Sequence, residues 1–205
     1  ETMIGNFIKN NGNPFAIATK ASISRDPETQ ERTFDNSSQH LETELNKSLG
    51  RLGVDYVDLF YIHRRDPRIP IEDVMETLLK FKKEGKIGGI GFSEISPSSL
   101  RRASEVGLVD AVQSEYSLWT RSAELGLIQT CQELGVSFIP FSPLGRGIFS
   151  ITPPDPFADA PAAPPASPRP PPPNPPKDAN GFSFLFQFNI YLPPIKQQQV
   201  HLLEW

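Results

Sequence analysis

The stretch YVDLFYIHRRDPRIPIEDVMETLLKFKKEGKIGGIGFSE, residues 56–94, decides the fold because it holds a strand, a helix and a second strand in succession. The apolar runs at 56–63 and 87–94 have the length and composition of buried strands. Between them, Pro70 suits the first turn of a helix, and Gly85 supplies a stop signal. Two strands joined by a helix predict a parallel pair with a right-handed crossover.

The same alternation extends to both sides of this stretch. Further strands are predicted at residues 15–20, 110–117 and 136–142, with helix signals between them. Repeated strand and helix with short turns predict an α/β fold with a parallel sheet. The alternation does not distinguish an open doubly wound sheet from a closed barrel. No GxGxxG follows an early strand, which counts against an open dinucleotide-binding sheet.

The bulk composition restricts the function classes. The chain has 205 residues, a net charge of -4 and a pI near 5.4, and no basic run is interleaved with aromatic residues. We therefore expect no nucleic-acid surface. No apolar run reaches the ~18 residues that span a bilayer, and the first residues lack a signal-peptide pattern. Cys131 is the only cysteine, which excludes an internal disulfide and fits a cytoplasmic protein.

The composition changes abruptly near residue 151. Fifteen of the 22 prolines lie beyond Ser150. Such a segment favours extended or disordered conformations over helices and inner strands. We predict a folded unit at residues 1–151 and a disordered proline-rich tail at 152–205. The apolar segment at 181–192 is expected to be either an edge strand or an exposed apolar segment.

Polar residues stand at or near the ends of the predicted strands. In a parallel α/β barrel the carboxyl ends of the strands open onto one face, and that face holds the active site. The sequence therefore predicts one site built from the whole folded unit. Its candidate residues are Lys20, His63, Ser93, Glu94, Gln113 and Ser142.

Each candidate also has a plainer interpretation. Lys20 is either an anion contact or an exposed lysine at a strand exit. His63 either donates a hydrogen bond and exchanges protons, or is a structural histidine. Ser93 and Gln113 either hold a planar carboxamide or serve as a helix cap and a core amide. The turn at 142–147 either cradles a phosphate, with help from Arg146, or is a simple tight turn.

Five segments in order carry a family resemblance: AIATK, YVDLFYIHRRD, KKEGKIGGIGFSEIS, AVQSEYSLW and IPFSPLGRG. Together they closely resemble the aldo-keto reductase family over residues 1–151. The resemblance implies an incomplete (β/α)8 TIM-type barrel. It also implies NADPH-dependent reduction of a small-molecule aldehyde or ketone, with NADP(H) as cofactor.

The resemblance assigns roles residue by residue. Lys20 matches the lysine of the catalytic tetrad, whose charge lowers the pKa of a tyrosine acid. His63 matches the tetrad histidine, which orients the substrate carbonyl. Ser93, Glu94 and Gln113 match positions that hold the nicotinamide carboxamide, although many members have Asn where Glu94 stands. The remaining matches are Phe141, which stacks on the nicotinamide, and Ser142, Leu144 and Gly145, which meet the pyrophosphate.

The sequence also departs from the family pattern. Its opening residues 1–7 match a segment that follows the tetrad aspartate and tyrosine, so both fall before residue 1. The eighth strand is not matched either, nor are the basic residues that hold the 2'-phosphate. We therefore expect a reductase truncated at both ends and impaired in turnover.

Two other interpretations stay open. One is a non-catalytic NADP-binding or interaction protein whose proline run at 170–176 engages a partner groove. The other is a chain that does not fold stably, because an open barrel exposes strand edges near residues 16–20 and 137–142. The sequence indicates neither the carbonyl substrate nor the oligomeric state.

Overall fold

The computed structural model describes residues 1–26 and 28–150. The predictions for the tail at 152–205 and its apolar segment at 181–192 lie outside these residues. In chain order the elements are α1 (Thr2–Asn11), β1 (Ala18–Ala21), β2 (Ile23–Arg25), β3 (Arg32–Phe34), α2 (Ser38–Leu52), β4 (Val57–Ile62), α3 (Ile71–Lys83), β5 (Ile87–Ser93), α4 (Pro97–Val106), β6 (Ala111–Glu115), η1 (Ser122–Leu125), α5 (Leu127–Leu134), β7 (Ser137–Phe141) and η2 (Gly145–Gly147).

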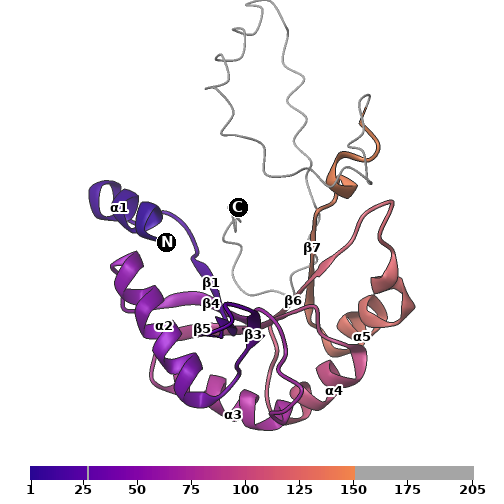
Figure 1. The fold of residues 1–205 in the computed structure, drawn as a ribbon, viewed down its shortest axis with the longest axis horizontal. Coiled ribbons are helices and arrows are strands. Elements are labelled where there is room, and N and C mark those ends of the chain that lie inside the picture. Colours follow the sequence, from indigo (N-terminus) through magenta and orange to yellow (C-terminus); the bar gives the residue numbers. More distant parts are fainter. Residues whose placement is uncertain (27, 151–205) are drawn as a thin grey trace, which may run out of the picture.

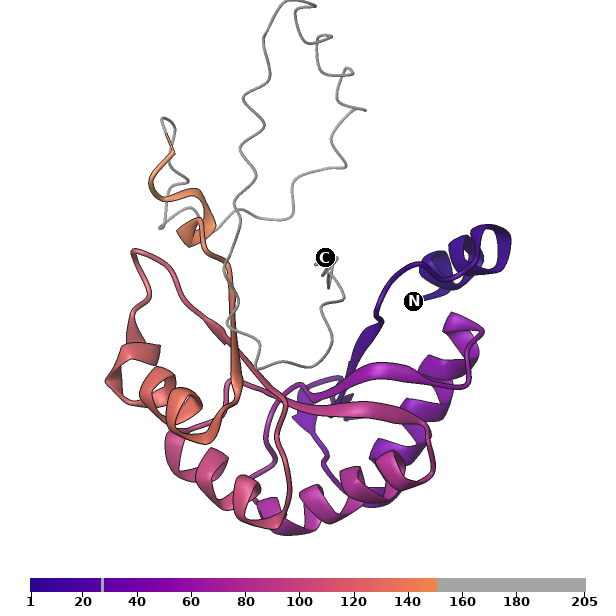
Figure 2. The same ribbon diagram turned by 180° about the vertical axis from the view of Figure 1, so that it is seen from behind.

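The centre of the described fold is a five-stranded sheet in the order β1-β4-β5-β6-β7, and every pair in it is parallel. A single helix, from α2 to α5, connects each strand to the next. Figure 1 shows these helices on the convex side of a curved sheet, and Figure 2 shows the same arc from behind. Sequential strand order and curvature match a barrel wall, so the predicted α/β architecture with a parallel sheet is confirmed.

Local signals in the sequence explain where the helices begin and end. The Ser37 and Ser96 side chains accept hydrogen bonds from the backbone N–H three residues on, which caps α2 and α4. Pro97 then occupies the first turn of α4. Gly53 and Gly135 end α2 and α5 in the left-handed conformation, where glycine costs least. These residues fix where α2 and α4 begin and where α2 and α5 end.

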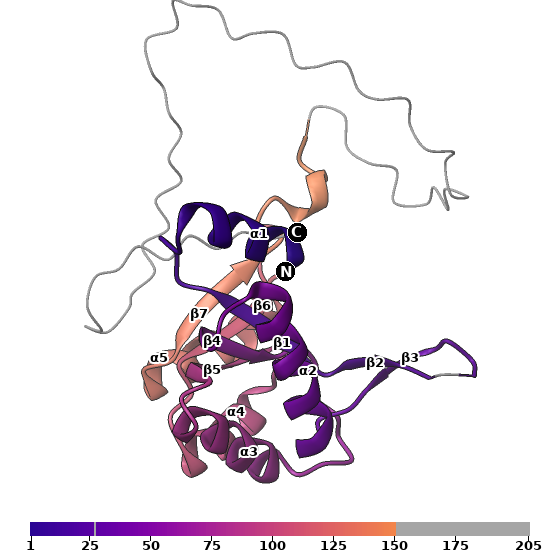
Figure 3. The same cartoon turned by 90° about the vertical axis from the view of Figure 1, so that its left-hand side faces the viewer.

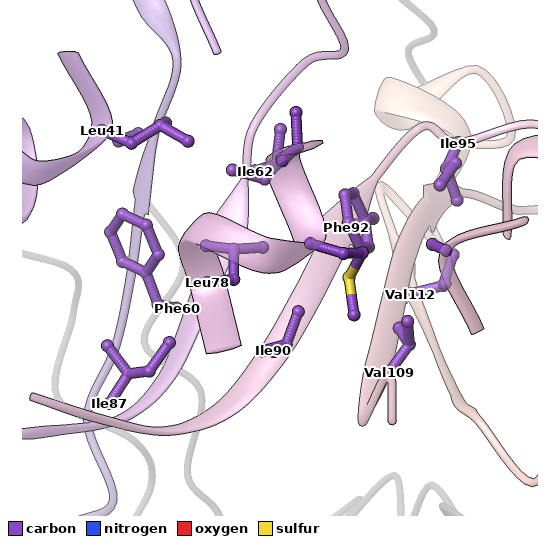
Figure 4. Close-up of a cluster of buried hydrophobic side chains, with 14 of the residues drawn as sticks. Leu41, Phe60, Ile62, Leu78, Ile87, Ile90, Phe92, Ile95, Val109 and Val112 are labelled. Carbon is purple, nitrogen blue, oxygen red and sulfur yellow. The ribbon is translucent and has the colours of Figure 1, made fainter. Parts of the chain in front are cut away.

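The hydrophobic core lies between the sheet and its helices. Along β4 and β5 the side chains of Phe60, Ile62, Ile90 and Phe92 point toward the helices and are fully buried. Figure 4 shows them packed with side chains from the helices, such as Leu78. Burial of each large apolar side chain stabilises the fold by about 1.5–3 kcal/mol. The helix layer is therefore held to the sheet mainly by apolar contact.

The opposite, concave face of the sheet carries the alternate residues. Lys20, Tyr61 and Gly91 are register partners across β1, β4 and β5, so they share this face. Gly91 has no side chain, and the Tyr61 ring fills the space above it. A Cβ atom on Gly91 would lie 2.4 Å from Cδ1 of Tyr61. Glycine is thus required at this point by close packing.

One element differs from the sequence expectation. No strand is predicted between residues 20 and 56, yet β2 and β3 form an antiparallel hairpin there. Figure 3 shows this hairpin projecting away from the sheet and its helices. Its turn is stabilised by the Asp26 carboxylate, which accepts hydrogen bonds from the backbone of Glu28 and Thr29. Strands of three residues in a polar segment carry too little alternation to be recognised.

The first strand is also shorter than predicted. The expected run was 15–20, whereas β1 covers Ala18–Ala21. Just before β1, the backbone N–H of Ile17 donates to the Asp58 carboxylate at 2.7 Å, so a side chain supplies its acceptor.

Among the described residues, no helix combines the length and the apolar character that a bilayer crossing needs.

We expect Gly91→Ala to lower the free energy of unfolding by about 1–3 kcal/mol, because the new methyl group overpacks against Tyr61. Urea denaturation measures the change. Gly50→Ala is the matched control, since Gly50 lies exposed in α2 and an added Cβ meets nothing within 4 Å. That change should instead raise stability by about 0.5 kcal/mol. Equal stability of Gly91→Ala and wild type would contradict the packing described for Tyr61.

Candidate functional site

The carboxyl ends of the parallel strands bring distant residues together. Lys20, near the end of β1, donates a hydrogen bond from Nζ to Oε1 of Gln113 on β6. Two strands, β4 and β5, lie between them in the sheet. The Lys20 ammonium also lies 5.6 Å from the centroid of the Tyr61 ring, a cation–π distance. The curvature of the sheet therefore brings together two residues that are 93 positions apart in the chain. We call this carboxyl end of the sheet, where Lys20 meets Gln113, the mouth.

His63 follows β4 directly and is half-buried at this mouth. Its backbone N–H donates to the carbonyl of Ala21 at 2.8 Å, which ties it to the end of β1. Burial lowers the pKa of His63 to about 4, with help from the positive charges of Lys20, Arg64 and Arg32. The imidazole is therefore neutral near pH 7 and carries one N–H donor and one acceptor. It is suited to donating a hydrogen bond to a carbonyl oxygen.

Ser93 and Gln113 are buried register partners on β5 and β6. The Ser93 hydroxyl accepts a hydrogen bond from Nη1 of Arg64 at 3.3 Å. Serine hydroxyl and glutamine amide groups both donate and accept, which is the donor set that a planar carboxamide needs. In chemical type, these residues fit the nicotinamide end of NADP(H). Their roles in holding it remain predictions.

Glu94 fastens β5 to β6 at this end of the sheet. Its backbone N–H donates to the carbonyl of Gln113 at 2.9 Å. Its carboxylate accepts from the backbone N–H of Glu115 at 2.8 Å. Glu94 adopts φ 53, a left-handed conformation that is uncommon for residues other than glycine. The observed contacts give Glu94 a structural role beside its predicted one.

The predicted stacking and pyrophosphate residues lie at the end of β7. Phe141 is half-buried, and its carbonyl accepts from the backbone N–H of Tyr116 at 3.2 Å. The chain then turns through Ser142 and Gly145, both with positive φ. Within the turn, the Gly145 N–H donates to Ser142 at 3.0 Å, while Leu144 stays exposed. The structure thus brings these residues onto the same end of the sheet as Lys20 and His63.

Arg146, considered above as a phosphate contact, is paired with a carboxylate of the chain itself. Its guanidinium lies 3.2 Å from the Glu115 carboxylate, in an exposed ion pair. An acidic partner reduces the positive charge that the turn offers to an anion.

No cluster of three or more His, Cys, Asp or Glu side chains placed to hold a metal ion occurs within residues 1–26 and 28–150.

Sequence reasoning missed the residues that hold the His63 loop. Ser22, Asn36 and Asp66 are all buried and polar. Ser22 and Asn36 contact the backbone of Arg64, and Asn36 also accepts from the backbone N–H of Asp66. No local pattern marks them, because these hydrogen bonds join residues that lie 28 to 42 positions apart in the chain.

Comparisons with known proteins identify the family of the chain. The Aldo/keto reductase family model matches residues 1–163. Probable aldo-keto reductase 1 from Glycine max is 44% identical over 116 residues, which are 57% of this chain and 34% of that protein. Aldo-keto reductase yakc from Schizosaccharomyces pombe, whose name includes NADP(+), is 39% identical over 155 residues, 73% of this chain and 46% of that protein. The chain thus spans a third to a half of the length of these relatives.

Solved structures show the same similarity. Aldo-keto reductase AKR11C1 from Bacillus halodurans, in its holo form, matches with a TM-score of 0.68 and 27% identity, over 75% of this chain and 51% of that one. Glycerol dehydrogenase AKR11B4 from Gluconobacter oxydans matches with a TM-score of 0.69 and 24% identity, over 78% of this chain and 52% of that one. The second likeness supports the fold alone.

We expect the stability of the folded chain to depend on pH through His63. The pKa is about 4 in the folded state against an ordinary 6.5, so only the unfolded chain gains this proton between those values. Stability contributed by the neutral imidazole is therefore complete above pH 6.5 and is lost as the pH falls toward 4. Urea denaturation of His63→Gln across this range should show a weaker pH dependence than wild type.

A second variant checks the cause. Lys20→Met removes a positive charge beside His63, so the pKa of His63 in the folded chain should rise. The pH range over which the free energy of unfolding changes through His63 should then become narrower. Identical pH profiles for wild type and His63→Gln would show that His63 titrates in the same way in both states.

Proposed function

Because the chain belongs to the aldo/keto reductase family, we propose that the carboxyl end of its sheet is the nicotinamide side of a carbonyl reductase. The reaction class is NADPH-dependent transfer of a hydride to an aldehyde or ketone. The observation that supports this most is the contact between Lys20 and Gln113, with His63 and Ser93 at the same end of the sheet. A predicted tetrad residue and a predicted cofactor-binding residue thereby share one mouth.

The residues divide into a cofactor group and a substrate group. When bound, NADP(H) supplies the hydride, and the protein supplies position and charge. Ser93, Glu94 and Gln113 would hold the carboxamide, and Phe141 would lie against the nicotinamide ring. The turn residues Ser142, Leu144 and Gly145 would meet the pyrophosphate.

The substrate group stabilises charge on the carbonyl oxygen. Neutral His63 would donate a hydrogen bond to this oxygen as it becomes negative. Lys20 would lower the pKa of an acid placed beside it, since a nearby cation favours the ionised form. Tyr61 turns its ring toward the Lys20 ammonium, which is a packing contact rather than an acid position. None of the tyrosines in this sequence matches the acid of the family tetrad.

These 205 residues therefore hold the orienting groups without a matched proton donor. We propose that they bind a reduced nicotinamide better than they turn over a carbonyl substrate. The alternative function, NADP binding without catalysis, uses the same cofactor group. A measurement of carbonyl turnover distinguishes a reductase from a protein that only binds NADP.

We expect the purified chain to reduce simple aldehydes such as benzaldehyde with NADPH only weakly or not at all. Loss of absorbance at 340 nm measures the reaction. Robust turnover that disappears in both Lys20→Met and His63→Ala would show that the site is complete, and would overturn the proposal that the acid is lacking.

We expect NADPH to bind, and Ser93→Ala and Gln113→Leu each to weaken binding by about fivefold. This follows because one buried hydrogen bond contributes about 1 kcal/mol and tenfold corresponds to about 1.4 kcal/mol. Fluorescence titration of NADPH measures the dissociation constant. Gln132→Leu, the same change on the exposed side of α5, is the matched control and should leave binding unchanged. Absence of NADPH binding at any concentration would contradict the proposed function.

A further inference from the structure

Ser22 occupies an unusual position at the end of β1, two residues after Lys20. Its exposed fraction is 0% and its φ is 121. Residues other than glycine rarely adopt such a backbone, because Cβ then crowds the main chain. A conformation of this kind persists only where surrounding contacts enforce it, and it is common at functional sites.

The enforcing contacts are a pair of hydrogen bonds to Arg64. The backbone N–H of Arg64 donates to the Ser22 hydroxyl at 2.9 Å, and the hydroxyl donates to the Arg64 carbonyl, also at 2.9 Å. The regular β1–β4 ladder ends just before this point, where the His63 N–H donates to Ala21. Beyond the end of β1, the Ser22 hydroxyl thus bonds to the Arg64 main chain in place of a backbone group of β1.

Asn36 fastens the same segment from the other side. It is buried, and its Nδ2 donates to the Arg64 carbonyl at 3.1 Å. Its Oδ1 accepts from the backbone N–H of Asp66 at 2.7 Å. The segment from Arg64 to Asp66 is therefore held by two buried side chains.

The held segment connects directly to the proposed site. His63 immediately precedes it, and the Arg64 guanidinium reaches back to the His63 carbonyl at 3.2 Å and across to the Ser93 hydroxyl at 3.3 Å. Displacement of the Arg64 backbone would therefore move both a predicted substrate residue and a predicted cofactor residue.

We infer that Ser22 is a positioning residue, which holds the His63 imidazole beside Lys20 through its paired hydrogen bonds to the Arg64 main chain. The catalytic meaning of this inference rests on the proposed function, since only a reductase needs His63 in that place. The positioning itself can be measured without cofactor or substrate.

The charge around His63 provides the measurement. The cations that face it come from different elements: Lys20 from β1, Arg32 from β3, and Arg64 from the segment that Ser22 holds. Burial and these charges together depress the pKa of His63. Release of the segment would admit water and move the imidazole away from Lys20, so the pKa would rise.

The experiment is an NMR titration of the histidine side chains in the full chain, with His63→Gln to assign the His63 signal. In Ser22→Ala and Ser22→Gly we expect the pKa of His63 to rise by about one unit, toward the ordinary histidine value of about 6.5. Glycine accepts φ 121 without crowding, so Ser22→Gly isolates the lost hydroxyl even if Ser22→Ala fails to fold. Asn36→Ala should move the pKa in the same direction.

Ser96→Ala is the matched control. It removes a serine hydroxyl that also accepts a backbone hydrogen bond, at the start of α4, where its side-chain partners are Ser98 and Ser99. It should lower the melting temperature without changing the His63 titration. If Ser22→Gly and Asn36→Ala likewise lower the melting temperature and leave the His63 titration unchanged, the network is only a structural clamp and the inference is wrong.

An NADPH titration of the same samples separates this inference from the proposed function. A raised His63 pKa in Ser22→Gly, together with no NADPH binding by wild type, would support the positioning role and overturn the proposed function. Normal NADPH binding by wild type, together with an unchanged His63 pKa in Ser22→Gly, would support the proposed function and overturn the positioning role of Ser22.

Discussion

The width of a helix relative to a strand is the constraint on which the rest of this structure depends. Strands in a sheet lie about 4.8 Å apart, whereas a helix with its side chains is about 10 Å wide. Here one α-helix connects each strand of the five-stranded sheet to the next, and these helices lie on the same side (Figure 1). A helix layer of that width covers the sheet only if the sheet bends away from it. Apolar burial of residues such as Phe60 and Phe92 makes this bending favourable.

Curvature then produces the site. The concave face has little room, so β5 carries Gly91 where the Tyr61 ring must fit. The same curvature brings Lys20 of β1 and Gln113 of β6 into hydrogen-bond contact across two intervening strands. Because the helix layer sets the curvature, the contact does not need the sheet to close. A chain that spans about half of its relatives' length can therefore retain the mouth.

The sequence predicted the repeating elements because period, proline and glycine signals are local. Ser96 and Pro97 show how a helix starts, and Gly135 shows how one ends. The clustering of Lys20, His63 and Gln113 followed from the rule that parallel strands present their carboxyl ends together. The hairpin and the Ser22 contacts were not predictable in this way. The strands of the hairpin are three residues each and carry too little alternation. The Ser22 contacts join residues 42 positions apart and need a backbone conformation that is rare for serine.

The two outer strands are not equivalent. The Ser137 N–H of β7 donates to the Asp110 carbonyl, and the Phe141 carbonyl accepts from the Tyr116 N–H. Asp110 and Tyr116 flank β6, so by alternation Pro140 directs its nitrogen outward. Proline has no N–H, and this edge therefore lacks a donor at that position. In β1 the carbonyls of Ile17 and Ala21 face β4, so the main-chain groups of Ala18 face outward with a donor and an acceptor. Within the described residues, the β1 edge is thus the better template for strand pairing, and it is also the edge that carries Lys20.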